Sequence, residues 1–179
     1  PMSINVADLT HEIRRANNGA VADCIGKTAA SNFHGVKNAL RCVLKTAELG
    51  HSVLGTKAMS WTGKVLHRAG LPLWTPSMPK SYNADKAQKT TAASPLKVVY
   101  FPSCLNQMMG LEKDSPASAP LVEVMTGLCA KAGYQVIFPE RMDSLCCGTI
   151  WESKGMPEIA DTKVRELEDM LWKASEGGK

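Results

Sequence analysis

The amino-acid sequence predicts an α/β fold, in which a Rossmann-like strand–helix–strand domain is preceded by a helical segment. Two short runs rich in β-branched and aromatic residues, 97–101 and 134–138, are each followed by a proline and are typical of strands. Between them, apolar residues recur at helical spacing from Leu121 to Cys129, and Gly133 follows as a stop signal. This order predicts two parallel strands joined by a right-handed crossover helix.

The N-terminal part of the sequence is predicted to be helical. Over 6–17, three apolar side chains share one helical face: Val6, Leu9 and Ile13. Further helices are expected over 20–30, from Phe33 onward, and over 56–69. Gly50 and Gly55 weaken the end of the helix that begins at Phe33, because glycine is a poor helix former.

Prolines and small polar residues dominate residues 71–96, which we interpret as an extended linker. This stretch divides the chain into three predicted parts: a helical segment at 1–70, the linker at 71–96 and a domain at 97–179. We expect the last part to end in a helix that begins at Pro157.

The composition is that of a globular protein rather than a disordered one, with 44% hydrophobic and 21% charged residues. The net charge of +4 is spread along the chain, and no basic run is dense enough to indicate nucleic-acid binding. No apolar stretch reaches the roughly 18 residues of a membrane span. Six cysteines in 179 residues are too few for a secreted disulfide scaffold, so we expect reduced thiols and an intracellular chain.

Basic side chains recur along the predicted helices at 36–68. They form either a solvated face, which is the simpler interpretation, or a surface that touches a membrane. These side chains are Arg41, Lys45, Lys57, Lys64 and Arg68.

Two adjacent cysteines followed by a glycine, Cys146-Cys147-Gly148, are the most informative feature of the sequence. A disulfide between neighbouring cysteines closes a strained ring, so the pair is better suited to bind a metal ion or an iron–sulfur cluster. A third cysteine, Cys104, follows the first predicted strand, and the pair follows the second. Because the carboxyl ends of parallel strands share one edge of a sheet, we expect the three thiols to converge there. Helix N-termini and backbone N–H groups at such an edge lower the pKa of thiols.

The other cysteines and the tryptophans have simpler interpretations. Cys24, Cys42 and Cys129 lie on predicted helices and are expected to pack as small apolar side chains. Trp151 is the tryptophan that follows the cysteine pair, where it could cover a cluster. The remaining tryptophans are expected to be packing groups.

The motifs Pro102-Ser103-Cys104 and Leu145-Cys146-Cys147-Gly148 resemble those of the cysteine-rich CCG domain, which binds an iron–sulfur cluster or zinc. The N-terminal segment and the run 98–110 resemble the C-terminal region of FAD-linked iron–sulfur D-lactate dehydrogenases and glycolate oxidase-like oxidoreductases. In that family a flavin oxidises a 2-hydroxy acid, and clusters pass the electrons to a quinone or a cytochrome. The resemblance implies that Cys104, Cys146 and Cys147 bind a [4Fe–4S]-type cluster for electron transfer.

The same resemblance implies that the chain is a fragment, since its start, Pro1-Met2-Ser3, reads as the middle of a structure. Its partners would be the flavin and ferredoxin-like domains of the same polypeptide, and the fragment alone is expected to be inactive. The implied location is cytoplasmic, with peripheral attachment to the inner membrane left open.

The sequence departs from the family pattern in one respect, because no cysteine follows Cys147 where the family has a further cysteine motif. Neither a flavin-binding motif nor a ferredoxin run of cysteines is present. Three alternatives therefore stay open: an iron–sulfur subunit of a heterodisulfide reductase-like or glycolate oxidase complex, thiol–disulfide chemistry, and a structural domain that binds zinc or docks. The hydroxy acid, the electron acceptor and the occupant of the thiol site are left undecided.

Overall fold

The computed structural model describes residues 5–68, 73–85 and 93–178. The chain forms two compact units, each assembled from separated segments. Unit 1 consists of Pro1–Val36, Val99–Ser103 and Ile137–Lys179, and unit 2 consists of Lys37–Val98 and Cys104–Val136. This grouping does not follow the divisions predicted at residues 70 and 96, which stay predictions.

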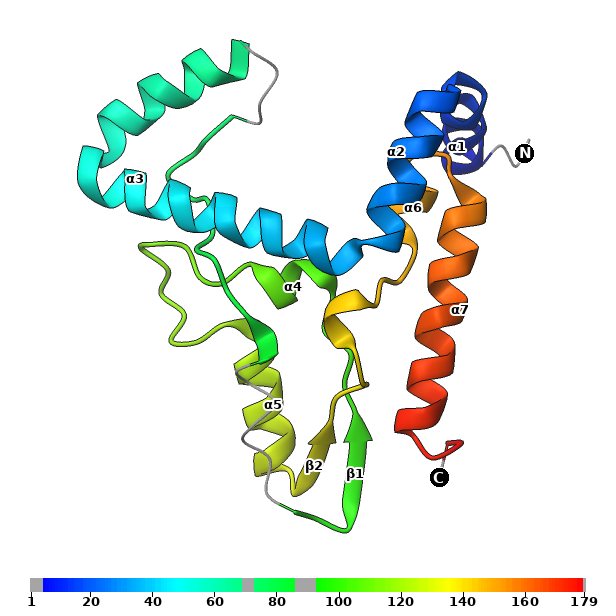
Figure 1. The fold of residues 1–179 in the computed structure, drawn as a ribbon. Helices are drawn as coiled ribbons and strands as arrows, with labels where there is room; N and C mark the ends of the chain where they lie inside the picture. Colours follow the sequence, from blue (N-terminus) through cyan, green and yellow to red (C-terminus); the bar gives the residue numbers. More distant parts are fainter. Residues whose placement is uncertain (1–4, 69–72, 86–92, 179) are drawn as a thin grey trace. The chain divides into compact units, whose positions relative to one another are not determined.

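Unit 1 is mainly helical, and α7 is its central helix because both α2 and α6 contact it. The helices of unit 1 are labelled in Figure 1. They are α1 (Val6–Asn17), α2 (Ala20–Ser31), α6 (Thr149–Glu152) and α7 (Pro157–Ala174), and the 3₁₀ turn η2 (Met142–Ser144) precedes α6. The prediction of a helix over 6–17 is confirmed, and Asn5 caps it by accepting a hydrogen bond from the Ala7 N–H. Pro157 begins α7 as predicted.

The first helix is anchored to unit 1 by polar contacts. Asn18 donates from Nδ2 to the carbonyl oxygens of Lys154 and Gly155, at 2.9 and 3.1 Å. Arg15 Nη2 lies 2.9 Å from Glu158 Oε1. The apolar face predicted for α1 is not its buried face, since Val6, Leu9 and Ile13 are each more than half exposed. Polar anchoring therefore replaces the apolar packing that the periodicity predicted.

Unit 2 holds most of the long helix and the small sheet. Its elements are α3 (Phe33–Arg68, whose first turn belongs to unit 1), β1 (Leu96–Val99), α4 (Cys104–Met108), α5 (Leu121–Lys131) and β2 (Tyr134–Ile137). Helix α3 is interrupted at Gly55, where φ is 73° and ψ is 171°, so this predicted weak position is a sharp bend (Figure 1). Trp74 contacts both arms of this bend: its ring lies 4.9 Å from that of His51, and its Cβ lies close to Gly63.

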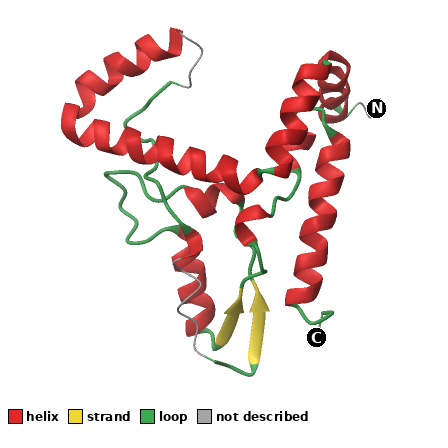
Figure 2. Cartoon of the chain, viewed as in Figure 1, coloured by secondary structure: helices red, strands yellow, loops and turns green. Residues whose placement is uncertain are grey.

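Strands β1 and β2 pair with each other and point in the same direction (Figure 2), with α5 between them in the chain. The described chain is thus rich in helix and contains a small parallel sheet, which is compatible with the predicted α/β class. Helix α5 buries Val122 and Thr126, whereas Leu121, Val124 and Leu128 of its predicted apolar face are exposed. The apolar spacing along α5 therefore does not mark its buried face.

Part of the predicted linker is built into unit 2. The Tyr82 N–H donates to the Met108 carbonyl at 2.9 Å, and the Lys80 N–H donates to the Leu111 carbonyl at 3.0 Å. Ala84 is fully buried. The residues 71–72 and 86–92 of that prediction lie outside the described part of the chain.

Two cations of α3, Lys37 and Arg41, are buried in unit 2. The Arg41 guanidinium donates to the carbonyl oxygens of Tyr82 and Gln107, both at 3.2 Å, and to Asn38 Oδ1 at 2.9 Å. Lys37 Nζ donates to the Gln107 side chain, which is itself fully buried. These cations therefore tie α3 to α4 and to the segment around Tyr82. The sequence-based grouping of Arg41 with the solvated or membrane-facing cations is wrong.

Candidate functional site

The cysteine pair lies in unit 1, in the short connection between η2 and α6. Along the chain, strand β2 is followed by the 3₁₀ turn of η2 and then by the pair. Leu145 and Cys146 are buried, with 1% of Cys146 exposed, whereas Cys147 is exposed. The two neighbouring thiols therefore occupy different environments.

Gly148 makes this arrangement possible. Its φ of 80° lies in the left-handed region, where side chains other than glycine are strained. A Cβ at this position would come within 2.8 Å of the Ala160 carbonyl oxygen and 2.9 Å of Val164 Cγ2. The glycine of the motif thus allows the backbone of the pair to turn and to lie directly against α7.

The pKa of Cys147 is lowered from its ordinary value. Partial burial of the thiol opposes ionisation, but hydrogen bonds outweigh this effect. They come from the hydroxyl and backbone of Thr149, the backbone of Cys147 itself and the Cys146 side chain. The Cys147 Sγ lies 3.3 Å from Thr149 Oγ1, so the hydroxyl can donate to the sulfur once the thiol has ionised. The predicted lowering of thiol pKa is confirmed for Cys147.

Trp151 follows the pair on α6 and is buried. Its ring meets that of Phe33 edge to face, with centroids 6.5 Å apart. Within the described residues, its Nε1–H is buried without a hydrogen-bond partner. Such a donor is costly to leave unsatisfied, so it marks a place where an acceptor would be stabilised.

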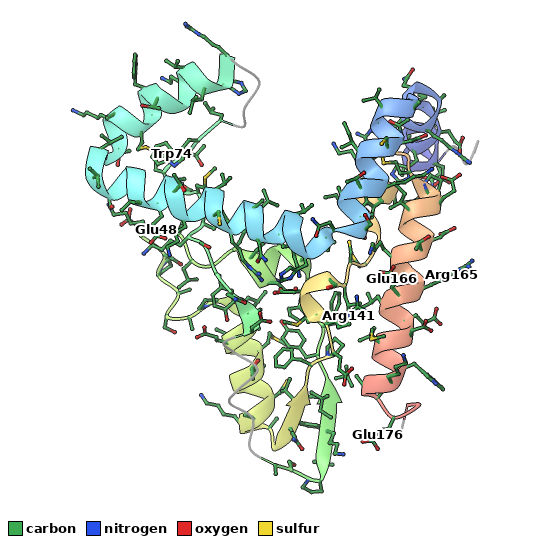
Figure 3. All side chains as sticks on the ribbon, viewed as in Figure 1. Glu48, Trp74, Arg141, Arg165, Glu166 and Glu176 are labelled. Carbon is green, nitrogen blue, oxygen red and sulfur yellow. The ribbon has the colours of Figure 1, made fainter. Side chains whose placement is uncertain are left out.

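A polar cavity of about 420 Å³ lies beside the segment that leads into the cysteine pair. It is lined by Ser144 and Leu145 and, from α7, by Lys163 and Glu166, whose Nζ and Oε2 are 2.8 Å apart. Arg141, at φ 55°, also borders it (Figure 3). Glu166 is about half exposed and neutralises this buried lysine, three residues before it on the same helix, a spacing that favours ion pairs.

Cys104 is the first residue of α4 and belongs to unit 2, whereas Cys146 and Cys147 belong to unit 1. Cys104 is partly buried. The predicted convergence of the three thiols stays a prediction.

All six cysteines are thiols. The prediction that Cys24 and Cys42 pack in a core is wrong, since both are exposed, and Cys129 is partly buried. Within residues 5–68, 73–85 and 93–178, no group of three or more His, Cys, Asp or Glu is placed to hold a metal ion. The Cys146–Cys147 pair fits a metal–thiolate centre in its donor chemistry, and it supplies two of the four ligands that such centres use.

In the metal-free protein, we expect Cys147 to be alkylated by iodoacetamide faster than the exposed thiols of Cys24 and Cys42 at about pH 7, because a lowered pKa gives more thiolate. The Thr149→Val variant lacks the hydroxyl donor, so the pKa of Cys147 should rise. The pH profile of the Cys147 alkylation rate should then move to higher pH. Peptide mapping by mass spectrometry across a pH series measures both. A Cys147 profile that coincides with that of Cys24 would contradict the assignment.

Comparison of the chain with protein-family models, with curated proteins and with solved structures finds no match. The cysteine pair and its surroundings are therefore the features of the chain that indicate a function.

Proposed function

We propose that this chain is the electron-transfer part of an FAD/iron–sulfur oxidoreductase that oxidises a 2-hydroxy acid, D-lactate in the first instance. Its ligands for an iron–sulfur cluster would be Cys104, Cys146 and Cys147. The observation that carries the proposal is the Cys146-Cys147-Gly148 turn, which holds a buried thiol beside one with a lowered pKa. Thiolates are the ligands that iron–sulfur clusters require.

Each residue of the turn would have a distinct part in holding such a cluster. Cys147 loses its proton readily, and Cys146 stands in a buried position that excludes water. The unpaired Nε1–H of Trp151 is a donor of the kind that tunes cluster potentials by hydrogen bonds to sulfur. When bound, the cluster would supply one-electron transfer. Cys104 is included because it follows β1 as the pair follows β2, which is an inference from chain order.

The remainder of the reaction would lie outside these residues. A flavin domain would take two electrons from the hydroxy acid and give a 2-oxo acid, and a ferredoxin-like domain would link the flavin to this chain. The final acceptor would be a quinone or a cytochrome. In this proposal residues 97–179 are a Rossmann-like cysteine-rich domain, and the location is cytoplasmic with peripheral attachment to the inner membrane.

Anaerobic reconstitution with iron and sulfide tests the proposal. We expect bound iron and sulfide, with absorption near 400 nm and an electron paramagnetic resonance signal on reduction. Serine variants at positions 104, 146 and 147 should each lose most of the bound iron. The matched controls Cys24→Ser and Cys42→Ser should keep it, since both thiols are exposed on helices away from the turn in the chain.

The same experiments distinguish an iron–sulfur centre from the structural alternative. Tight binding of one zinc ion, with no cluster after reconstitution, would favour a zinc or docking domain. If neither iron nor zinc binds, and the serine variants behave like the parent, the ligand assignment fails.

A further inference from the structure

The arm of α3 that follows the Gly55 bend carries an unusual combination of charge and exposed apolar surface. Residues 49–84 contain no aspartate or glutamate. Within this stretch, cations recur on the second arm at Lys57, Lys64 and Arg68, and all three are exposed. Among the described residues, no ion pair neutralises any of these three. The arm therefore has an uncompensated positive charge.

One face of the arm is fixed against the rest of unit 2. Gly63 is buried against Trp74, since a Cβ at this glycine would come within 2.9 Å of the Trp74 Cβ. Met59 reaches back across the bend, with its sulfur 3.1 Å from the position that a Cβ on Gly50 would take. Trp74 is labelled in Figure 3 and also contacts His51 on the first arm. The bend is thus braced, and the orientation of the arm within unit 2 is set.

The opposite face of the arm is an interleaved stripe of cations and large apolar side chains. Trp61 is 69% exposed and Val65 is 47% exposed. The stripe members are spaced by four, three, one and three residues, which keeps them on one side of a helix. They are Lys57, Trp61, Lys64, Val65 and Arg68, and we call this set the stripe.

Other apolar side chains near the stripe in the chain are also exposed. Val53 and Leu54 are exposed just before the bend, and Leu66 is exposed on the side of the arm that carries Gly63. Exposed apolar side chains at this density are typical of a surface that binds something. Among the described residues, Trp74 packs against the Gly63 face of the arm, whereas Trp61 and Val65 stay exposed.

We propose that the stripe docks on an anionic phospholipid surface, with the second arm lying flat in the headgroup region. Lysine and arginine are attracted to anionic headgroups, and tryptophan prefers the boundary between headgroups and acyl chains. None of the described helices has the length and apolar character needed to span a bilayer. A nucleic acid or an acidic peptide would satisfy the cations, but an anionic lipid surface also takes up the exposed apolar side chains of Trp61 and Val65. This inference does not depend on the proposed cluster.

Co-sedimentation of the full chain with vesicles tests the docking surface. We expect binding to vesicles of equal parts phosphatidylglycerol and phosphatidylcholine, little binding to phosphatidylcholine alone, and weaker binding at high salt. The double variant Lys57→Glu/Lys64→Glu should lose affinity by roughly tenfold or more. Trp61→Ser should lose several-fold while keeping the charge.

Matched controls distinguish binding by the stripe from a general effect of net charge and from a general effect of exposed tryptophan. Lys131→Glu/Lys173→Glu makes the same charge change on exposed lysines of α5 and α7, and Trp172→Ser removes a tryptophan that is also largely exposed. Both should bind vesicles like the parent. Circular dichroism and the milder Lys57→Gln/Lys64→Gln variant guard against a folding defect.

Two outcomes would overturn the proposal. The first is vesicle binding that the stripe variants and the controls reduce equally. The second is binding to single-stranded DNA that depends on Lys57 and Lys64 but not on Trp61, without binding to anionic vesicles, which would assign the stripe to nucleic acid.

Discussion

Replacing Arg41 by alanine is expected to destabilise unit 2 by about 3–5 kcal/mol, because hydrogen bonds to buried charged groups are strong and their loss leaves buried acceptors unpaired. Arg41 is only 8% exposed, and its guanidinium donates to the carbonyl oxygens of Tyr82 and Gln107. An alanine would remove the donors to both carbonyl oxygens and the packing of the side chain. The change in free energy of unfolding in urea measures the effect.

Two further variants show whether charge or geometry is responsible. Lys45→Ala lies one turn along α3 on an exposed side chain and should change stability by less than about 0.5 kcal/mol. Arg41→Lys keeps the charge, but its compact ammonium lacks the planar fork that lets the guanidinium reach separated acceptors from three nitrogens, so it should recover only a minor part of the loss. An Arg41→Ala variant as stable as Lys45→Ala would show that the guanidinium does not hold unit 2 together.

Gly148→Ala is expected to destabilise unit 1 by about 2–4 kcal/mol, from backbone strain at positive φ together with overpacking. The new Cβ would stand 2.8 Å from the Ala160 carbonyl oxygen, and neither backbone can move without disturbing α6 or α7. The turn should open, and the alkylation profile of Cys147 should then shift toward that of an ordinary thiol. Urea unfolding and the alkylation assay measure the two effects.

Substitutions at two other glycines distinguish backbone strain from steric crowding. Gly133 has φ 84°, but a Cβ added there would have no neighbour within 4 Å, so Gly133→Ala should show the strain alone and cost about 1–2 kcal/mol. Gly127 lies inside α5 with open space around it, and Gly127→Ala should stabilise by about 0.5–1 kcal/mol. If Gly148→Ala lowers the free energy of unfolding no more than Gly133→Ala does, the contact between position 148 and α7 adjusts without an energetic penalty.

Local signals predicted the helices and strands well. The bounds of α1 and the start of α7 follow from periodicity and capping, and Gly55 bends α3 where its sequence is weakest. The periodicity of apolar residues does not show which segment a helix packs against. Val6, Leu9 and Ile13 form an apolar stripe on α1, yet polar contacts from Arg15 and Asn18 decide how that helix is held.

The cysteine motif was recognisable in the sequence, but the difference between its two thiols was not. That difference depends on Thr149 reaching back to Cys147, and on α7 closing over Gly148 and leaving Cys146 inside. The burial of Arg41 could not be predicted from the sequence either. Its acceptors are main-chain carbonyls at 82 and 107, which become neighbours only in the folded chain.

The interleaving of the two units has a consequence for biosynthesis. Arg15 and Glu158, which bind each other in unit 1, are 143 residues apart in the chain. At ribosomal rates of about 5–20 residues per second, roughly 7 to 30 s pass between the appearance of α1 and that of its partner helix. The segments of unit 2 emerge within this interval. We therefore expect the polar contacts of Arg15 and Asn18, and the packing of Gly26 and Ala30 of α2, to form only after α7 has been made.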